Sequence, residues 1–211
     1  MVLPQDKMVC CPTRETIIDI LAHRQRKSID NPRLRAAAVL VPLFEKSGAL
    51  HVLLTRRTDD VEYHKGQICF PGGGCDAGDR TRCETALREA FEEIGLRAQD
   101  AEILGELDDS VTVTSGFLVS AFVAFIPYPY PFILNQRETK ESLEVPLSVF
   151  LSLDNFKLRQ VPGMNATAYF VDWRSNVIWG ATAAILKNFA DLLVDWTTKY
   201  AAALQRGRRS V

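Results

Sequence analysis

The sequence predicts an α/β domain in which helices flank a central mixed β-sheet. The expected elements follow the order helix, strands, glycine-rich segment, helix, strands and helices, which differs from the regular strand–helix alternation of a parallel array. A chain of 211 residues is long enough to bury one sizeable core. Its hydrophobic content of 47% and charged content of 24% are typical of a globular protein. We therefore expect one layered domain.

The bulk properties also exclude several classes of function. The formal net charge is −1, so no global field attracts nucleic acid or an anionic membrane. No apolar run is long enough to span a bilayer, and the first residues lack the basic-then-apolar pattern of a signal peptide. The five cysteines, an odd number, suit a reducing compartment better than a disulfide framework. These properties favour a cytoplasmic protein with no nucleic-acid or membrane partner.

Residues 1–33 are expected to form an N-terminal helical extension packed on the domain. Their helix should cover residues 13–29, because apolar residues recur there at helical spacing and Thr13 has the character of an N-cap. Asn31 and Pro32 should end it, since the residue before a proline disfavours the α conformation.

A β-hairpin is expected next. Residues 36–44 are a near-continuous apolar run, which favours a strand that is covered on both faces. A turn at residues 46–48 should lead into a returning strand at residues 50–55, whose alternate side chains point to opposite faces.

The second half of the chain predicts further strands and a long final helix. The expected strands lie at residues 102–107, 117–126 and 166–173. Residues 135–144 are polar and acidic and are expected in a loop. From residue 179 to about 203, apolar residues recur at helical spacing, and this stripe fits a core position or a dimer interface equally well. Residues 34–203 would then form the domain, and residues 204–211 a basic tail.

The glycine-rich segment is predicted to be a turn that contacts an anion. Gly72, Gly73 and Gly74 permit positive φ and let backbone N–H groups approach a phosphate closely. Thr81 and Glu84 follow with the spacing of a capping box, so a helix should begin near residue 82.

Three carboxylates should share an exposed face of this helix, which Gly95 ends. Glu89, Glu92 and Glu93 are three and four residues apart, and each like-charged pair costs about 0.2–0.5 kcal/mol. A divalent cation such as Mg²⁺ compensates that repulsion, because it binds carboxylates together with water and substrate phosphates. Arg88 stands four residues before Glu92 and could hold that carboxylate in place. The pattern predicts a metal site for a phosphorylated substrate.

A basic cluster precedes the glycines. Arg57, His64 and Lys65 could neutralise phosphate oxygens and so help to bind the substrate. A solvated loop explains the same composition equally well.

Residues 74–96 resemble the Nudix box, whose pattern is G-x5-E-x7-R-E-U-x-E-E-x-G-U with U a bulky apolar residue. The second half of the pattern matches at residues 88–96. Two positions depart from it, because Arg80 stands where the first Glu is expected and the small Ala90 takes the first apolar position. The resemblance implies the Nudix fold, an α/β/α sandwich with a central mixed β-sheet and a metal site at a glycine loop and helix.

This resemblance also implies a reaction. Nudix enzymes hydrolyse a nucleoside diphosphate linked to another moiety, with Mg²⁺ or Mn²⁺ as the cofactor. Carried over to this chain, Glu92 and Glu93 would be the principal metal ligands, and Glu89 a further ligand or the base. The base varies across the family, and Glu141 and Glu144 of the acidic segment are further candidates, although each could simply be a solvated loop carboxylate.

The residues upstream of the box resemble the signature of the coenzyme A pyrophosphatase subgroup, LLTxR[SA]x3Rx3Gx3FPGG. The matches include residues 53–55, Arg57 and residues 70–73. Thr58 replaces the expected Ser or Ala, and Glu62 replaces the second Arg. The resemblance implies hydrolysis of coenzyme A or an acyl derivative to 3′,5′-ADP and 4′-phosphopantetheine.

Other interpretations stay open. Glu62 could exclude a 3′-phosphate and favour ADP-ribose, NADH or a dinucleoside polyphosphate. A catalytically silent, nucleotide-binding Nudix domain is a second possibility, against which the three intact glutamates argue. Zinc on His64, Cys69, Cys75 and Cys83 is a third, but these spacings do not resemble the paired short knuckles of structural zinc sites. A homodimer would fit the habit of the family and the long final helix.

Overall fold

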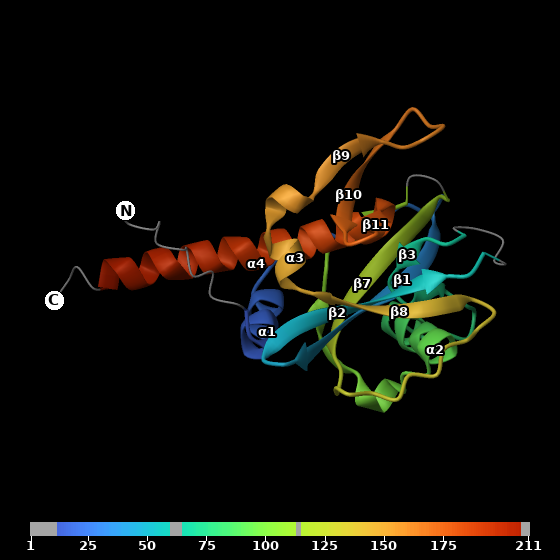
Figure 1. The fold of residues 1–211 in the computed structure, drawn as a ribbon, viewed down its shortest axis with the longest axis horizontal. Helices are drawn as coiled ribbons and strands as arrows, with labels where there is room; N and C mark the ends of the chain where they lie inside the picture. Colours follow the sequence, from blue (N-terminus) through green and yellow to red (C-terminus); the bar gives the residue numbers. More distant parts are fainter. Residues whose placement is uncertain (1–11, 60–64, 113–114, 208–211) are drawn as a thin grey trace.

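A mixed β-sheet forms the centre of the protein, which we describe from a computed structural model (Figure 1). The structure describes residues 12–59, 65–112 and 115–207, and side chains only as far as residue 199. The strands of the central sheet are β1 (Arg35–Lys46), β2 (Ala49–Arg57), β3 (Ile68–Cys69), β4 (Gly72–Gly74), β5 (Glu102–Glu106), β6 (Ser110–Val111), β7 (Phe117–Phe125) and β8 (Thr139–Pro146). The main path runs β3-β2-β1-β7-β5, with β4 paired to β1, β6 to β7 and β8 to β2.

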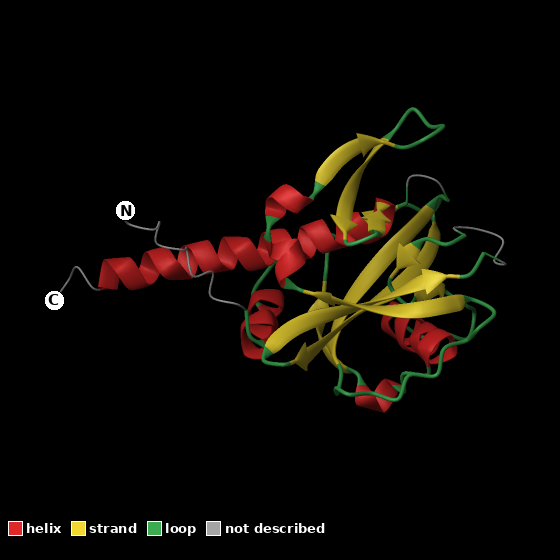
Figure 2. Ribbon diagram, viewed as in Figure 1, coloured by secondary structure: helices red, strands yellow, loops and turns green. Residues whose placement is uncertain are grey.

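The pairing of these strands makes the sheet mixed. β1 and β7 are parallel over nine residue pairs, whereas β1 pairs antiparallel with β2 and with β4. The predicted hairpin at residues 46–48 is confirmed. The α/β class with a central mixed sheet between helices is therefore also confirmed (Figure 2).

Hydrophobic clusters cover both faces of this sheet. Ala38 and Leu40 of β1 pack on one face with helix α2 (Arg82–Ile94). Ala37 and Val41 of the same strand point to the other face, where helices α1 (Arg14–Ala22) and α4 (Gly180–Gly207) complete the larger cluster. The alternation expected of a strand buried on both faces is thus observed.

The N-terminal helix is shorter than predicted. Thr13 caps it as expected, since its side chain accepts a hydrogen bond from the Thr16 amide at 3.2 Å. The helix ends at Ala22, however, and the expectation of a helix to residue 29 is wrong. The following residues leave the helix because they bind buried acidic groups: Arg26 Nη2 lies 2.6 Å from Asp109 Oδ1.

The acidic segment is also corrected, because residues 139–146 form strand β8 and not a loop. β8 pairs antiparallel with β2, and its charges find partners on neighbouring strands. Arg56 Nε donates to Glu141 Oε1 at 2.6 Å, and Lys46 pairs with Glu144.

A second, three-stranded sheet follows. It consists of β9 (Lys157–Gln160), β10 (Thr167–Trp173) and β11 (Asn176–Trp179), of which β9 is not predicted from the sequence. Val161, Ala168 and Phe170 form a small cluster of their own, and the Trp179 ring stacks on Phe170 with centroids 5.6 Å apart. The short helix α3 (Ser148–Leu151) and the 3-10 turns η1 (Ala98–Asp100) and η2 (Leu153–Asn155) complete the fold.

The final helix α4 runs from Gly180, close to the predicted start. Its first turns lie beside the second sheet, and its later turns extend away from the central sheet (Figure 1). Within the described residues, no helix combines the length and the apolar character that a membrane crossing requires.

Candidate active site

Helix α2 begins and ends where the sequence predicts. The Thr81 hydroxyl accepts a hydrogen bond from the Glu84 amide at 3.1 Å, so the helix starts at Arg82. Gly95 takes the left-handed conformation with φ 70° and donates its N–H to Phe91 O at 2.9 Å, which closes the helix. These local signals fix the register of the carboxylates on α2.

The three glycines form a strand, so the predicted turn is wrong. In β4, Gly72, Gly73 and Gly74 pair with Val39, Ala38 and Ala37 of β1. Close packing against β1 requires glycine here, because a Cβ atom on Gly72 would lie 2.4 Å from Ala38 O. β4 is thus a strand without side chains, so other groups can approach its backbone closely.

Glu89 rests directly against this strand. A Cβ atom on Gly73 would lie 2.5 Å from the Glu89 carboxyl carbon, so the carboxylate occupies the place of a side chain. Burial raises the pKa of Glu89, and the neighbouring Arg88 guanidinium opposes that rise.

Glu93 is buried, contrary to the expectation of an exposed helix face. Its side chain is 3% exposed, because it shares the inward face of α2 with Ala86 and Ala90. Oε1 lies 3.4 Å from Arg57 Nη1, whereas Oε2 has no hydrogen-bond partner. Burial raises the pKa of Glu93 to about 8, and the positive charge of Arg57 offsets only part of this effect.

Arg88 connects the other carboxylates. Its Nη1 lies 2.9 Å from Glu89 Oε1 and 3.2 Å from Glu92 Oε2, so the predicted contact with Glu92 is present. Nε and Nη2 donate to the two oxygens of Asp79, each at 3.0 Å, and this pairing holds the pKa of Asp79 well below its usual range. Asp79 therefore connects the loop between β4 and α2 to helix α2. It stands next to Arg80, the position at which the Nudix pattern has its first Glu.

The residues present fit a divalent cation, although they are not gathered into a closed cluster. Across the described residues, no three His, Cys, Asp or Glu side chains converge as a ready metal site, which also applies to Cys69, Cys75 and Cys83. Two observations favour a cation nevertheless. The buried Oε2 of Glu93 lacks a partner, and the Glu89 carboxylate packs on the bare backbone beside it. Carboxylate oxygens are the ligands that Mg²⁺ and Mn²⁺ prefer.

Glu138 is a fourth carboxylate at this site that the sequence analysis missed. Its negative charge acts on both Glu89 and Glu93 and contributes to their raised pKa values. Asn135 connects it to α2: the Asn135 amide donates to Glu93 O at 2.9 Å, and Asn135 Nδ2 lies 3.5 Å from Glu138 Oε1.

Thr58 holds the same turn from β2. Its hydroxyl donates to Arg137 O at 2.9 Å, and its amide donates to Glu138 O at 2.9 Å. Thr58 is also the position at which the sequence departs from the Ser or Ala of the subgroup signature. This departure is the sequence signal that lies nearest to Glu138 in the structure. The signature does not show that the Thr58 hydroxyl binds the carbonyl of Arg137, which is far away in the sequence.

The other candidate carboxylates, Glu141 and Glu144, are paired with Arg56 and Lys46 rather than with α2. A catalytic role for Glu141 stays a prediction. Lys65 is exposed, and both His64 and Glu62 lie outside the described residues.

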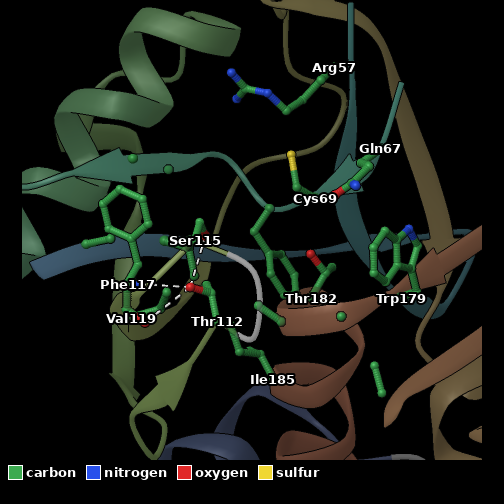
Figure 3. A pocket seen from close by; sticks show the side chains of 18 of the residues that line it. Arg57, Gln67, Cys69, Thr112, Ser115, Phe117, Val119, Trp179, Thr182 and Ile185 are labelled. Atoms are coloured by element: carbon green, nitrogen blue, oxygen red, sulfur yellow. Dashed lines mark hydrogen bonds between the residues drawn. The ribbon is translucent and has the colours of Figure 1, made fainter. Parts of the chain in front are cut away.

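A cavity of about 350 Å³ lies beside Arg57 (Figure 3). Arg57 and all three glycines of β4 line it, so four of the predicted substrate-binding residues lie together. The first turns of α4 and the residues Val161, Ala168 and Trp179 form the other walls. Arg57 Nε is buried in the structure without a hydrogen-bond partner.

Carboxylate oxygens suit a divalent cation, and an arginine that faces a cavity suits a phosphate oxygen. Sequence comparison supplies the family. Residues 34–167 match the NUDIX domain, and the chain belongs to the Nudix hydrolase family. It is a pyrophosphatase that acts on nucleoside diphosphate derivatives, and members of the family generally use divalent cations.

Individual relatives support this assignment. The uncharacterized Nudix hydrolase NudL of Yersinia pestis is 36% identical over 174 residues, which cover 82% of this chain and 85% of the relative. NudL of Yersinia pseudotuberculosis gives the same values. The crystal structure of a MutT/nudix family protein from Enterococcus faecalis shares the fold, with a TM-score of 0.52 and 17% identity over 82% of this chain and 66% of that chain.

Substitution of Gly73 by Ala should impair catalysis while the fold is retained. The new Cβ would meet the end of a flexible side chain, so Glu89 would be displaced at little cost in stability. We expect kcat to fall by about 10- to 100-fold, the range found when groups that orient a metal ligand are removed.

Gly78→Ala is the matched control, because a Cβ there meets no atom within 4 Å and Gly78 does not line the cavity. Steady-state kinetics and thermal melts of both variants check the prediction. Equal activity of the two variants would show that the Glu89–Gly73 contact has no catalytic role.

Proposed function

We propose that the protein hydrolyses the pyrophosphate bond of coenzyme A or its acyl derivatives, giving 3′,5′-ADP and (acyl-)4′-phosphopantetheine. The observation that carries this proposal is the contact between two sequence motifs. Arg57, from the signature that resembles coenzyme A pyrophosphatases, lies 3.4 Å from Glu93 of the Nudix box. Both motifs therefore contribute to one site, beside a cavity that can hold part of the substrate.

Each residue has a role in this reaction. Glu89, Glu92 and Glu93 would hold Mg²⁺ or Mn²⁺, which supplies charge neutralisation at the pyrophosphate and an acidified water. Arg57 would donate to a phosphate oxygen, since its buried Nε has no partner within the protein. Arg88 holds Glu89 and Glu92 in their relative positions. The free backbone of β4 would contact the phosphates.

We assign the general base to Glu138 in preference to Glu141. Glu138 acts electrostatically on two carboxylates of α2, and bonds from Thr58 and Asn135 keep its turn against the site. Glu141 is engaged by Arg56 at 2.6 Å. A base must reach the attacking water, and a carboxylate beside the metal ligands is the better placed of the two.

A second candidate function rests on Glu62, which stands where the subgroup signature has Arg. A negative charge there would disfavour the 3′-phosphate of coenzyme A. ADP-ribose, NADH or a dinucleoside polyphosphate would then be the substrate. The carboxylates of α2 argue against a domain that only binds nucleotides. We further propose that the protein is cytoplasmic and forms a homodimer.

A substrate panel tests the proposal directly. Coenzyme A, ADP-ribose, NADH and dinucleoside polyphosphates would each be incubated with Mg²⁺ and with Mn²⁺, and the products separated by chromatography. We expect coenzyme A to give the highest kcat/KM and the products named above. Negligible turnover of coenzyme A alongside rapid turnover of another compound would overturn the proposal in favour of the second function.

Glu93→Gln should abolish turnover and leave the fold intact. Loss of a direct ligand should lower kcat by at least about 100-fold, the upper end for residues that only support a ligand. Because burial already disfavours the charged form of Glu93, an uncharged Gln of the same size should leave the melting temperature nearly unchanged. Binding of Mn²⁺, followed by electron paramagnetic resonance, should weaken.

Glu84→Gln is the control, since Glu84 lies on the same helix and pairs with Arg80 on the surface. Near-normal activity and Mn²⁺ binding of Glu93→Gln would remove Glu93 from the site.

The choice of base is tested by Glu138→Gln and Glu141→Gln. We expect the first to lower kcat by about 10²- to 10⁴-fold, the contribution of a general base, with little change in KM. Glu141→Gln should retain most of its activity, because it loses only a partly exposed ion pair with Arg56. Steady-state kinetics with the preferred substrate check this prediction. If Glu141 is the base, kcat would fall strongly in Glu141→Gln and only slightly in Glu138→Gln.

A further inference from the structure

The cavity and the carboxylates lie on opposite faces of the glycine strand. Successive residues of a strand point to opposite faces. Gly73 pairs with Ala38 and faces α2, where Glu89 occupies the place of its side chain. Ala37 and Val39, the neighbours of Ala38, line the cavity on the other face. Only a layer of backbone without side chains separates the two.

Arg57 is the residue that connects the two faces. Its side chain lines the cavity, and its Nη1 lies 3.4 Å from Glu93 Oε1 on the α2 side. In Figure 3, Arg57 lies at one end of the cavity, and Thr182 and Ile185 of α4 lie at the other. A substrate phosphate bound by Arg57 would therefore lie at that end of the cavity, with one half of the molecule directed toward α4.

The interior of the cavity is suited to an uncharged group. Among its described lining residues, Arg57 is the only one with a charged side chain. Most of the walls are apolar, with Phe117 and Val119 from β7, Ile185 from α4 and Trp179 from β11. A volume of about 350 Å³ lies within the range of small-molecule pockets, about 300–1,000 Å³.

A few polar groups also face this space. Thr112, Ser115 and Thr182 are among the lining residues, and the Ser115 hydroxyl donates to Thr112 Oγ1 at 3.0 Å. The first N–H groups of α4, which have no partner within the helix, belong to the lining residues around Ala181. Apolar walls with a few polar groups, among them the first N–H groups of α4, match a chain that carries amide carbonyls.

The two halves of the proposed substrate differ in charge. The nucleotide half carries the 3′-phosphate, and burying a charged group without a partner is costly. The pantetheine half is uncharged and contains methyl groups, methylenes and two amides.

We propose that the cavity binds the pantetheine arm, so that the 3′-phosphoadenosine half stays outside it. This assignment rests on the proposed coenzyme A hydrolysis. The assignment adds the orientation of the substrate: the pantetheine arm lies on the cavity side of β4. Arg57 then marks the boundary between the halves, next to the pyrophosphate that is cleaved.

Direct binding of each half tests the orientation. Pantetheine and 3′,5′-ADP would be titrated separately, by isothermal calorimetry with Mg²⁺ present, into the wild-type protein and into Ala181→Phe, which places a ring in the cavity. We expect pantetheine to bind the wild type and to bind Ala181→Phe about tenfold more weakly, the equivalent of about two buried methylene groups. The affinity for 3′,5′-ADP should stay the same.

Two further variants control the experiment. Ala184→Phe adds the same ring on α4 at a residue that does not line the cavity, and it should leave both affinities unchanged. Ala168→Leu narrows the cavity from β10 and provides a second route if Ala181→Phe does not fold.

The outcomes separate the orientation from the function. If wild-type protein does not bind pantetheine, or if the cavity variants weaken 3′,5′-ADP instead, the orientation is overturned, whatever compound is hydrolysed. If pantetheine binds as expected but coenzyme A is not turned over, the cavity assignment stands and the proposed reaction fails.

Discussion

The site depends on the contact between the Glu89 carboxylate and the bare backbone of Gly73. A helix packed on a sheet normally keeps the distance that two layers of side chains impose. At β4 the sheet contributes no side chains, so α2 can place carboxylates directly against the strand. The same lack of side chains leaves room for the cavity on the opposite face. The carboxylates of the candidate site and the cavity can therefore lie within the length of one small substrate.

The placement of charge follows from this packing. Glu93 is buried where water cannot compensate its charge, and Arg57 offers only one long contact to it. On the solvent side, Arg88 binds Asp79, Glu89 and Glu92 at once. Arg88 thus compensates the charge of Asp79 well and that of the partly buried Glu89 only in part, while the buried Glu93 depends on Arg57. An under-compensated buried carboxylate is what a cation or a positively polarised ligand stabilises.

Local signals made much of this structure predictable. The N-cap at Thr81 and the left-handed Gly95 act within a few residues, so the limits of α2 follow from the sequence. Burial of Glu93 could not be predicted, because charge alone suggests an exposed position and only packing on the sheet overrides it. Glu138 was missed because its place depends on bonds from Thr58, which is about eighty residues earlier in the chain. Strand β8 was hidden by its charges, whose partners lie on β1 and β2, far away in the sequence.

The separation of the two faces by β4 has an evolutionary consequence. The cavity walls come partly from the second sheet and its own small cluster around Phe170, and partly from the start of α4. None of these segments contributes a carboxylate of α2. If the cavity recognises one half of the substrate as proposed, mutations there would change the group that is recognised and leave the candidate metal ligands of α2 in place. Such a modular arrangement gives a lineage a short mutational route from one nucleotide conjugate to another.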